Sequence, residues 1–399
     1  MKVKIGFLGV AHPHARPHFR TLELLDEVSG IVAWDEDDEA LERLRREDHP
    51  KLEPGQPTFD QIMEREDIPI VVSLATNDRN PEWVIRAAKA GKHVLTEKPV
   101  AASSADLAPL LDAVRGAGVR LGVYYTWRSH PIVNDLRALI DAGVIGKLLS
   151  VEGRMVTSQV RFRDPSHWLF RKRIAGGGIL SWLGCHWIDA IRYITRDEVA
   201  AVTAMVDTLN EQPIDVEDTA GVIMRMGSGA IATLHAGYLL PISQAGYLSG
   251  SYDTYLGFRG LEGNITWYPT DEDRSIVVES TSKTWNATPR RELKYVVAES
   301  EAYGGRYGQD FVGRFIASAM GADNAAGMDG STGSASPDGP EDPDDPVSPD
   351  DPVSPGSSEV PQAPYDDGEN ALRVLRIIEA AYRSSETGRM VSLEQDRKG

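Results

Sequence analysis

The chain has almost no cysteine and no long apolar run. Cys185 is the one cysteine among 399 residues, so no disulfide can form within the chain, which suits a reducing compartment. No apolar stretch approaches the length of a membrane span, and the short run near the N-terminus lacks a signal-peptide cleavage site. We therefore predict a cytoplasmic protein that has no membrane partner.

Positive charge is also scarce, because 42 Lys and Arg stand against 60 Asp and Glu, for a formal net charge of −18. Nucleic acids and anionic membranes need basic surfaces, so we expect neither as a partner. Much of the acidity is local, since residues 322–372 contain 13 Asp and Glu and no Lys or Arg. Residues 322–365 consist mainly of Gly, Ser, Pro and Asp, cannot bury apolar area, and are predicted to form a disordered insertion.

The rest of the chain has the pattern of a two-domain α/β and α+β protein. Five apolar segments alternate with helical ones as far as Tyr125, which predicts a doubly wound parallel sheet. From Val199 to Glu299 most segments alternate with period two, as in an antiparallel sheet. We expect a nucleotide-binding α/β domain at 1–125 and an α+β domain at 126–399 with a large open, mostly antiparallel sheet.

The turn after the first strand keeps only part of a dinucleotide fingerprint. Gly-x-Gly-x-x-Gly would be expected, whereas residues 9–14 read Gly-Val-Ala-His-Pro-His. Asp35 ends the second strand, where a carboxylate suits the ribose diol of NAD, and its acidic neighbours would repel the extra phosphate of NADP. We predict NAD as the cofactor, with NADP less favoured. The expected cofactor contacts are Gly9, Ala11, His12, His14, Asp35, Ala75, Thr76, Asn77, Glu97 and Lys98.

His12, His14 and His18 lie close together in the sequence. A metal site needs further ligands, and no acidic residue or cysteine stands near them along the chain. Histidines beside a phosphate at a helix N-terminus are the alternative interpretation. We therefore predict no metal site.

Glu97-Lys98-Pro99 follows the fourth predicted strand. In an open α/β sheet, a lysine at the carboxyl end of a strand places an ammonium where such sheets bind ligands. We predict that Lys98 contacts the substrate; a solvated surface lysine is the alternative.

A glycine triplet at 176–178 opens a predicted helix on which Trp182, His186 and Asp189 share one face. An imidazole and a carboxylate one turn apart can form an acid/base pair in which the acid orients the ring. A structural His–Asp pair at a domain interface is the alternative. Cys185 points away from this face and is assigned no chemistry.

Aromatic and hydrogen-bonding residues gather where the first domain ends, at the expected cleft, and suit a hydroxyl-rich substrate. The basic segment 161–173 either binds an anionic group or forms a solvated loop. The expected substrate contacts are Tyr125, Arg128, Trp168, Trp182 and His186.

Taken together, these motifs resemble the Gfo/Idh/MocA oxidoreductase family. The resemblance extends over nearly the whole chain outside 322–365. It implies an N-terminal Rossmann domain and a C-terminal domain on an open mixed sheet that often carries subunit contacts, hence a homodimer or homotetramer. The motifs that carry it are Ala-Gly-Lys-His-Val-Leu-Thr-Glu-Lys-Pro at 90–99, the glycine triplet with His186-x-x-Asp189, Ile-Gly-Lys at 145–147, Val-Glu-Asp-Thr-Ala at 216–220 and Glu-Ala-Ala-Tyr-Arg-Ser at 379–384.

The resemblance also implies a function and its residues. Lys98 matches the family lysine that contacts the reacting oxygen, and His186 matches the catalytic histidine. The family commonly has an aspartate four residues before that histidine, where this chain has Trp182. The carboxylate must then come from elsewhere, for which Asp189 is the candidate, or the proton relay is reduced to Lys98 and His186.

The resulting prediction is an NAD(H)-dependent dehydrogenase that acts on CH–OH groups of a sugar, cyclic polyol or related carbohydrate. Two alternatives stay open. One is a non-catalytic regulator of the same fold that binds dinucleotide or sugar. The other is an NAD-dependent glycosidase with no net redox change.

Overall fold

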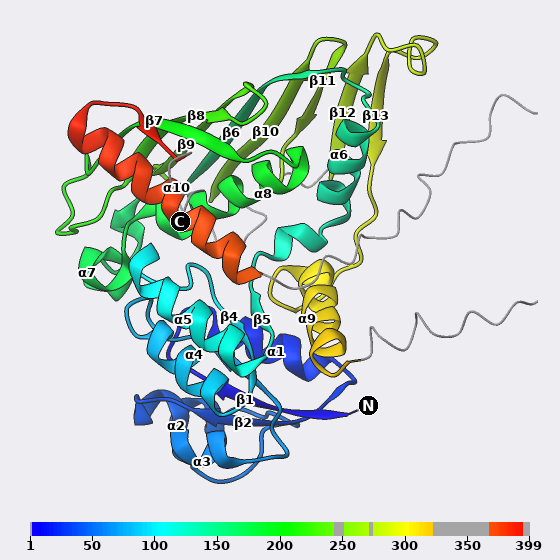
Figure 1. Cartoon of the computed structure of the whole chain (residues 1–399). Coiled ribbons are helices and arrows are strands. Elements are labelled where there is room, and N and C mark those ends of the chain that lie inside the picture. Colours follow the sequence, from blue (N-terminus) through cyan, green and yellow to red (C-terminus); the bar gives the residue numbers. More distant parts are fainter. Residues whose placement is uncertain (1, 243–250, 271–273, 322–366, 394–399) are drawn as a thin grey trace, which may run out of the picture.

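The computed structural model of the chain describes residues 2–242, 251–270, 274–321 and 367–393. The insertion predicted at 322–365 lies outside these residues. Figure 1 shows two sheets, with α8 and α10 between them. No helix in the described residues has the length and apolar character needed to cross a bilayer.

The N-terminal sheet, sheet A, has five parallel strands in the described residues, in the order β2-β1-β3-β4-β5. Because the order reverses between β1 and β3, a ligand crevice is expected outside the carboxyl ends of these strands. The strands are β1 (Val3–Leu8), β2 (Val28–Trp34), β3 (Ile70–Ser73), β4 (His93–Thr96) and β5 (Leu121–Val123). The helices are α1 (Ala15–Leu24), α2 (Asp38–Arg46), α3 (Phe59–Glu64), α4 (Asn80–Lys89) and α5 (Ser104–Ala117).

Local sequence explains much of this half. β3 is buried at every position, as expected for a parallel strand covered on both faces. Thr58 begins α3 with a reciprocal capping box to Gln61. Asn80, in the first turn of α4, bonds the Ser73 and Thr96 hydroxyls and the Val100 carbonyl, so it fixes the segment that carries Lys98.

The second sheet, sheet B, has nine strands in the described residues, in the order β13-β12-β11-β10-β6-β9-β8-β7-β14. All neighbours are antiparallel except β6 and β9, which confirms the predicted large and mostly antiparallel sheet. The strands are β6 (Leu148–Ser158), β7 (Val199–Asp207), β8 (Thr219–Met226), β9 (Ile231–Leu240), β10 (Tyr252–Gly260), β11 (Gly263–Trp267), β12 (Ser275–Ser280), β13 (Arg290–Lys294) and β14 (Val391–Ser392).

The remaining helices cover sheet B on the side of sheet A or connect the two halves (Figure 1). Three short 3₁₀ turns and one π-helical turn, η4, interrupt the connections. The helices are α6 (Pro131–Asp141), α7 (Lys172–Ala175), α8 (Cys185–Thr195), α9 (Gly305–Ala319) and α10 (Asp367–Thr387). The turns are η1 (Thr126–Ser129), η2 (Val160–Phe162), η3 (Trp168–Phe170) and η4 (Leu180–Gly184).

Helix α9 comes late in the chain but packs on the first half. Phe311 and Phe315 share a buried cluster with Phe7 and Phe19. A Cβ added to Gly122 of β5 would lie 2.6 Å from the Phe315 ring, so a glycine is needed there for this contact. The domain division at 125/126 stays a prediction, and α9 crosses it.

Candidate active site

The strands of sheet A end at one level, so the residues after them gather at one edge. Leu8 is paired with both Trp34 and Ser73, and Ser73 with Thr96. Asp35 follows β2, and its carboxylate accepts a 2.8 Å hydrogen bond from the Ala11 amide in the turn after β1. The predicted cofactor turn and the predicted ribose ligand are therefore in contact.

The residues at this edge fit a dinucleotide. Gly9 has φ of +98°, and a Cβ there would lie 2.5 Å from the Leu74 carbonyl oxygen. The only fingerprint glycine that this turn retains is therefore required by its backbone conformation and by the closeness of the Leu74 backbone. Each carboxylate oxygen can accept more than one hydrogen bond, so Asp35 can bind the ribose diol as well as the Ala11 amide. Asn77, by contrast, donates its side-chain amide to the Ala175 carbonyl at 2.7 Å and links the two halves.

Lys98 is completely buried at this edge. Its ammonium donates to the Trp182 carbonyl oxygen at 3.0 Å and lies 3.9 Å from the centroid of the Trp182 ring. The interpretation of Lys98 as a solvated surface lysine is therefore wrong. Trp182 stands where the family commonly has an aspartate. It offers the Lys98 ammonium a backbone oxygen and an aromatic face instead of a carboxylate.

The helix predicted from the glycine triplet is not continuous. It begins as the π-helical turn η4 and becomes α-helical only at Cys185. π-helical turns are wider than α-helical ones and are frequent at functional sites. Residues four apart therefore need not share a face across η4. The Trp182 ring lies beside His12 and His14, whereas His186 lines a cavity against sheet B.

The Trp182 ring faces the cofactor edge. Its centroid lies 5.0 Å from the His14 ring, 6.0 Å from the His12 ring and 6.1 Å from the Trp168 ring. Trp168 and Trp182, both predicted as substrate contacts, thus border the turn that is expected to hold the cofactor.

Glu97 joins two of the histidines. One of its oxygens lies 2.8 Å from His14 Nδ1 and 2.6 Å from His18 Nε2. Burial raises the pKa of the Glu97 carboxyl, but its interactions with His14, Lys98 and His18 outweigh this effect, so the pKa lies well below its ordinary value. Glu97 is ionised, and both imidazole nitrogens that face it act as donors.

The expectation that no acidic residue stands beside these histidines is wrong. Strand β4 brings Glu97 to His14 and His18, and their possible ligand atoms lie within 4.8 Å of one another. The second nitrogen of His18 has no hydrogen-bond partner in the described residues, whereas metal-bound imidazoles usually donate from that nitrogen. The absence of a metal stays a prediction.

The predicted His186–Asp189 pair is also wrong. The Asp189 carboxylate accepts from Arg128 at 2.6 and 3.0 Å and from the Asn370 amide at 2.7 Å. It thereby links η1, α8 and α10, and the Arg128 guanidinium compensates its buried charge. His186 Nδ1 is buried and has no hydrogen-bond partner in the described residues. Arg128, predicted to bind substrate, pairs with Asp189, and its contact with substrate stays a prediction.

Beyond His186, a cavity of about 730 Å³ lies against sheet B, lined by residues that include Trp127, Trp187 and Trp267. Of the predicted substrate contacts, only His186 lines it. Sequence reasoning placed Trp187 in the core and gave Trp267 no role, because the strand and helices that bring them together are far apart in the chain. Tyr125 is 1% exposed and packs edge-on to His186 with 6.1 Å between centroids.

Cys185 is buried next to this region. Burial raises the pKa of its thiol to about 12, so it is protonated at neutral pH. Its Sγ donates to the Trp182 carbonyl at 3.5 Å. Both observations agree with assigning it no chemistry.

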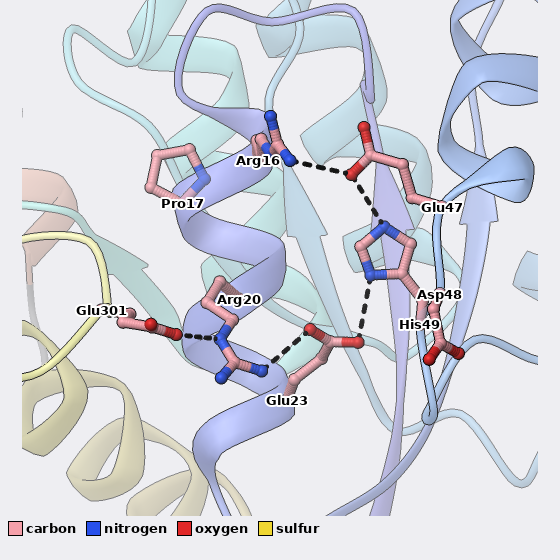
Figure 2. Close-up of a pocket in the computed structure, with 8 residues that line it drawn as sticks. All are labelled: Arg16, Pro17, Arg20, Glu23, Glu47, Asp48, His49 and Glu301. Carbon is pink, nitrogen blue, oxygen red and sulfur yellow. Dashed lines mark hydrogen bonds and ion pairs between the residues drawn. The ribbon is translucent and has the colours of Figure 1, made fainter.

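A second hollow, of about 670 Å³, lies on the outer side of α1 (Figure 2). Its charged side chains pair with one another: Arg20 with Glu301 at 2.7 Å, His49 with Glu23 at 3.1 Å, and Arg16 with Glu47 at 3.3 Å. Neither Lys98 nor His186 lines the hollow, so it is separate from the proposed site.

The chain is similar in sequence to curated oxidoreductases that are named for carbohydrate substrates. Levoglucosan dehydrogenase from Pseudarthrobacter phenanthrenivorans is 27% identical over 288 residues, which cover 66% of this chain and 71% of that protein. 1,5-Anhydro-D-fructose reductase from Ensifer adhaerens is 29% identical over 190 residues, covering 48% of this chain and 56% of that protein.

Solved structures share the fold. An oxidoreductase domain protein from Kribbella flavida aligns with a TM-score of 0.77 at 20% identity, covering 98% of this chain and 99% of that one. Levoglucosan dehydrogenase in complex with NADH and levoglucosan aligns with a TM-score of 0.73 at 22% identity, covering 99% and 100%.

The family assignment comes from both halves of the chain. Residues 3–125 match the oxidoreductase family with an NAD-binding Rossmann fold, and residues 133–265 match the GFO/IDH/MocA C-terminal domain. The resemblance seen in the sequence motifs is confirmed. The chain belongs to the Gfo/Idh/MocA family of oxidoreductases and has an NAD-binding Rossmann domain at its N-terminal end.

Proposed function

We propose that the protein is an NAD(H)-dependent dehydrogenase that interconverts a CH–OH group and a carbonyl group on a sugar, cyclic polyol or related carbohydrate. The observation that carries the proposal is the buried Lys98 ammonium, held between the cofactor edge of sheet A and the helix that bears His186. Levoglucosan dehydrogenase and the inositol 2-dehydrogenase of Rhizobium meliloti, among the relatives, are named for reactions of this class.

Lys98 and His186 have complementary roles in this proposal. Oxidation removes a hydride from the carbon and a proton from its hydroxyl group, and bound NAD⁺ is the hydride acceptor. Lys98 stabilises the negative charge that develops on the oxygen. Burial and the Lys98 charge lower the pKa of His186 well below its ordinary value, so its ring is neutral and can accept the hydroxyl proton.

The cofactor edge supplies the remaining contacts. Asp35 binds the ribose diol, and the turn from Gly9 to His14 faces the pyrophosphate. His12 Nδ1 accepts from the His14 amide at 3.1 Å, so in the neutral ring the proton is on Nε2, which is a donor for a phosphate oxygen. Burial lowers the pKa of His12 well below its ordinary value, which keeps the ring neutral.

We extend the proposal to assembly through sheet B as a homodimer or homotetramer. Met205 on β7 is 84% exposed, Ile223 on β8 49% and Leu149 on β6 46%, so this sheet carries apolar side chains that a subunit contact would cover. Light scattering of the purified protein tests this, and a monomer would contradict it.

The deciding experiment is a panel of sugars and polyols assayed for reduction of NAD⁺ and NADP⁺, with wild-type protein and Lys98→Ala. We expect turnover with NAD⁺, and a loss of at least about 100-fold in kcat for Lys98→Ala. The exposed Lys89→Ala is the matched control. Unchanged turnover in Lys98→Ala would overturn the mechanism. Binding of NAD without net reduction would favour the glycosidase or the regulator.

A further inference from the structure

The cavity beside His186 is built from four separate parts of the chain. Sheet B forms its floor through Met155 and Trp267, α8 contributes Trp187, and η1 contributes Trp127. The segment 297–307, which leads into α9, closes the remaining side. Its volume of about 730 Å³ lies in the upper part of the range of roughly 300–1,000 Å³ found for small-molecule sites. A single sugar ring would leave most of this space unfilled.

Trp127 is the centre of the aromatic wall. Its ring centroid lies 5.5 Å from His130, 5.6 Å from Trp267, 5.8 Å from Tyr307 and 5.9 Å from Trp187. These neighbours hold the indole in place, while Trp127 itself is only half-buried and lines the cavity. Flat, rigid aromatic faces of this kind pack against the C–H face of a sugar ring or against an aryl group.

The wall also holds a neutral hydrogen-bond donor. His130 Nδ1 accepts from the Ile132 amide at 3.1 Å, so the proton of the neutral ring is on Nε2. Burial, with a smaller effect of Arg274, lowers the pKa of His130 to about 3, so the ring is uncharged at neutral pH. The cavity thus combines apolar faces with polar groups, among them two basic and two acidic side chains, Arg274, Arg306, Glu299 and Glu301.

We propose that this cavity is a subsite for the second ring of a glycoside or disaccharide, whose first ring presents its CH–OH group to Lys98 and His186. The inference rests on the proposed function for the position of the reacting ring. It adds that the preferred substrate is larger than a free monosaccharide, and that Trp127 provides the stacking face for the second ring.

The test compares methyl, phenyl and glucosyl glucosides as substrates with NAD⁺. We expect kcat/KM for the phenyl and glucosyl compounds to exceed that for the methyl compound by at least about tenfold, because only they reach the aromatic wall. Trp127→Ala should remove this difference and leave the methyl compound within about threefold of wild type. Tyr268→Ala, which removes an exposed aromatic group next to Trp267 in sequence, should leave the difference unchanged.

A second variant covers the case in which Trp127→Ala does not fold. Ala302 is buried and lines the cavity, so Ala302→Leu fills part of it and should lower kcat/KM for the two-ring substrates selectively. A methyl glucoside that is as good a substrate as the larger ones, or equal losses for all substrates in both variants, would overturn the subsite.

Calorimetric titration of the same glucosides into the NAD-loaded protein separates the two proposals. Tight binding of the phenyl and glucosyl compounds that is weakened by Trp127→Ala, without NADH formation, supports the subsite and contradicts the dehydrogenase. NADH formation from single-ring sugars only, with no preference for the larger glucosides, supports the dehydrogenase and contradicts the subsite.

Discussion

At the scale of single residues, the decisive contact joins Lys98 to Trp182. A carboxylate at position 182 would hold the ammonium by charge, whereas the structure uses a backbone carbonyl at 3.0 Å and the face of an indole. The preceding residue, Glu97, carries a carboxylate whose pKa is lowered in part by the Lys98 charge. Because the carbonyl survives any substitution of the side chain, the ring and the oxygen can be tested separately.

We expect Trp182→Phe to keep most of the activity and Trp182→Ala to lose about 30-fold in kcat. A desolvated cation–π contact contributes about 2 kcal/mol, and phenylalanine retains an aromatic face. Steady-state kinetics measures the effect, with melting curves to confirm that each variant is folded at the assay temperature. The control is Tyr268→Ala, which removes an exposed aromatic side chain. Equal activity of Trp182→Ala and wild type would show that the ring does not position Lys98.

At the scale of elements, the Arg128–Asp189 pair determines how η1, α8 and α10 meet. Asp189 is 1% exposed and is surrounded by the Arg128 guanidinium and the Asn370 amide. Arg128 follows Trp127 in η1, Asp189 comes three residues after His186 in α8, and both Trp127 and His186 line the cavity. Asp189 is therefore placed to support the site rather than to transfer a proton to His186.

Asp189→Asn should lower the free energy of unfolding by about 3 kcal/mol, because it removes the closer of the two carboxylates beside Arg128; the other, Asp367, is 3.8 Å away. Urea denaturation measures this. Glu42→Gln, which removes an exposed partner of Arg46, should change stability by less than about 0.5 kcal/mol. If Asp189→Asn were as stable as wild type but shifted the pH profile of kcat, the catalytic interpretation of Asp189 would be restored.

At the scale of the whole molecule, buried neutral histidines determine the response to acid. Burial lowers the pKa values of His12, His18, His130 and His186 in the folded protein. In the unfolded chain these imidazoles bind protons below about pH 6.5, so the unfolded state binds more protons than the folded state in that range. Stability must therefore fall as the pH falls below about 6.5.

For His130 alone the expected loss is about 1.4 kcal/mol per pH unit between about pH 6.5 and its folded pKa of about 3. Urea denaturation at about pH 7.5 and about pH 5.5 measures the total. His130→Asn keeps an acceptor at the start of α6 but removes the titrating group, so it should reduce the pH-dependent loss by this share. The exposed His235→Asn should not. A pH-independent stability over this range would contradict the assignment of neutral histidines.

The sequence by itself determined the order of the elements, the two sheet types and the NAD-binding character of the first half, and it singled out Lys98 and His186 as candidates. These follow from periodicity, turn residues and motifs, which depend on neighbours along the chain. Tertiary structure alone decided which side chains meet. Glu97 bonds histidines about 80 positions away, Lys98 bonds a backbone carbonyl of the π-helical turn η4, and Asp189 bonds Arg128 rather than His186. The hydrogen-bond partner of each of these side chains depends on how segments distant in sequence pack together, and a local sequence pattern cannot predict it.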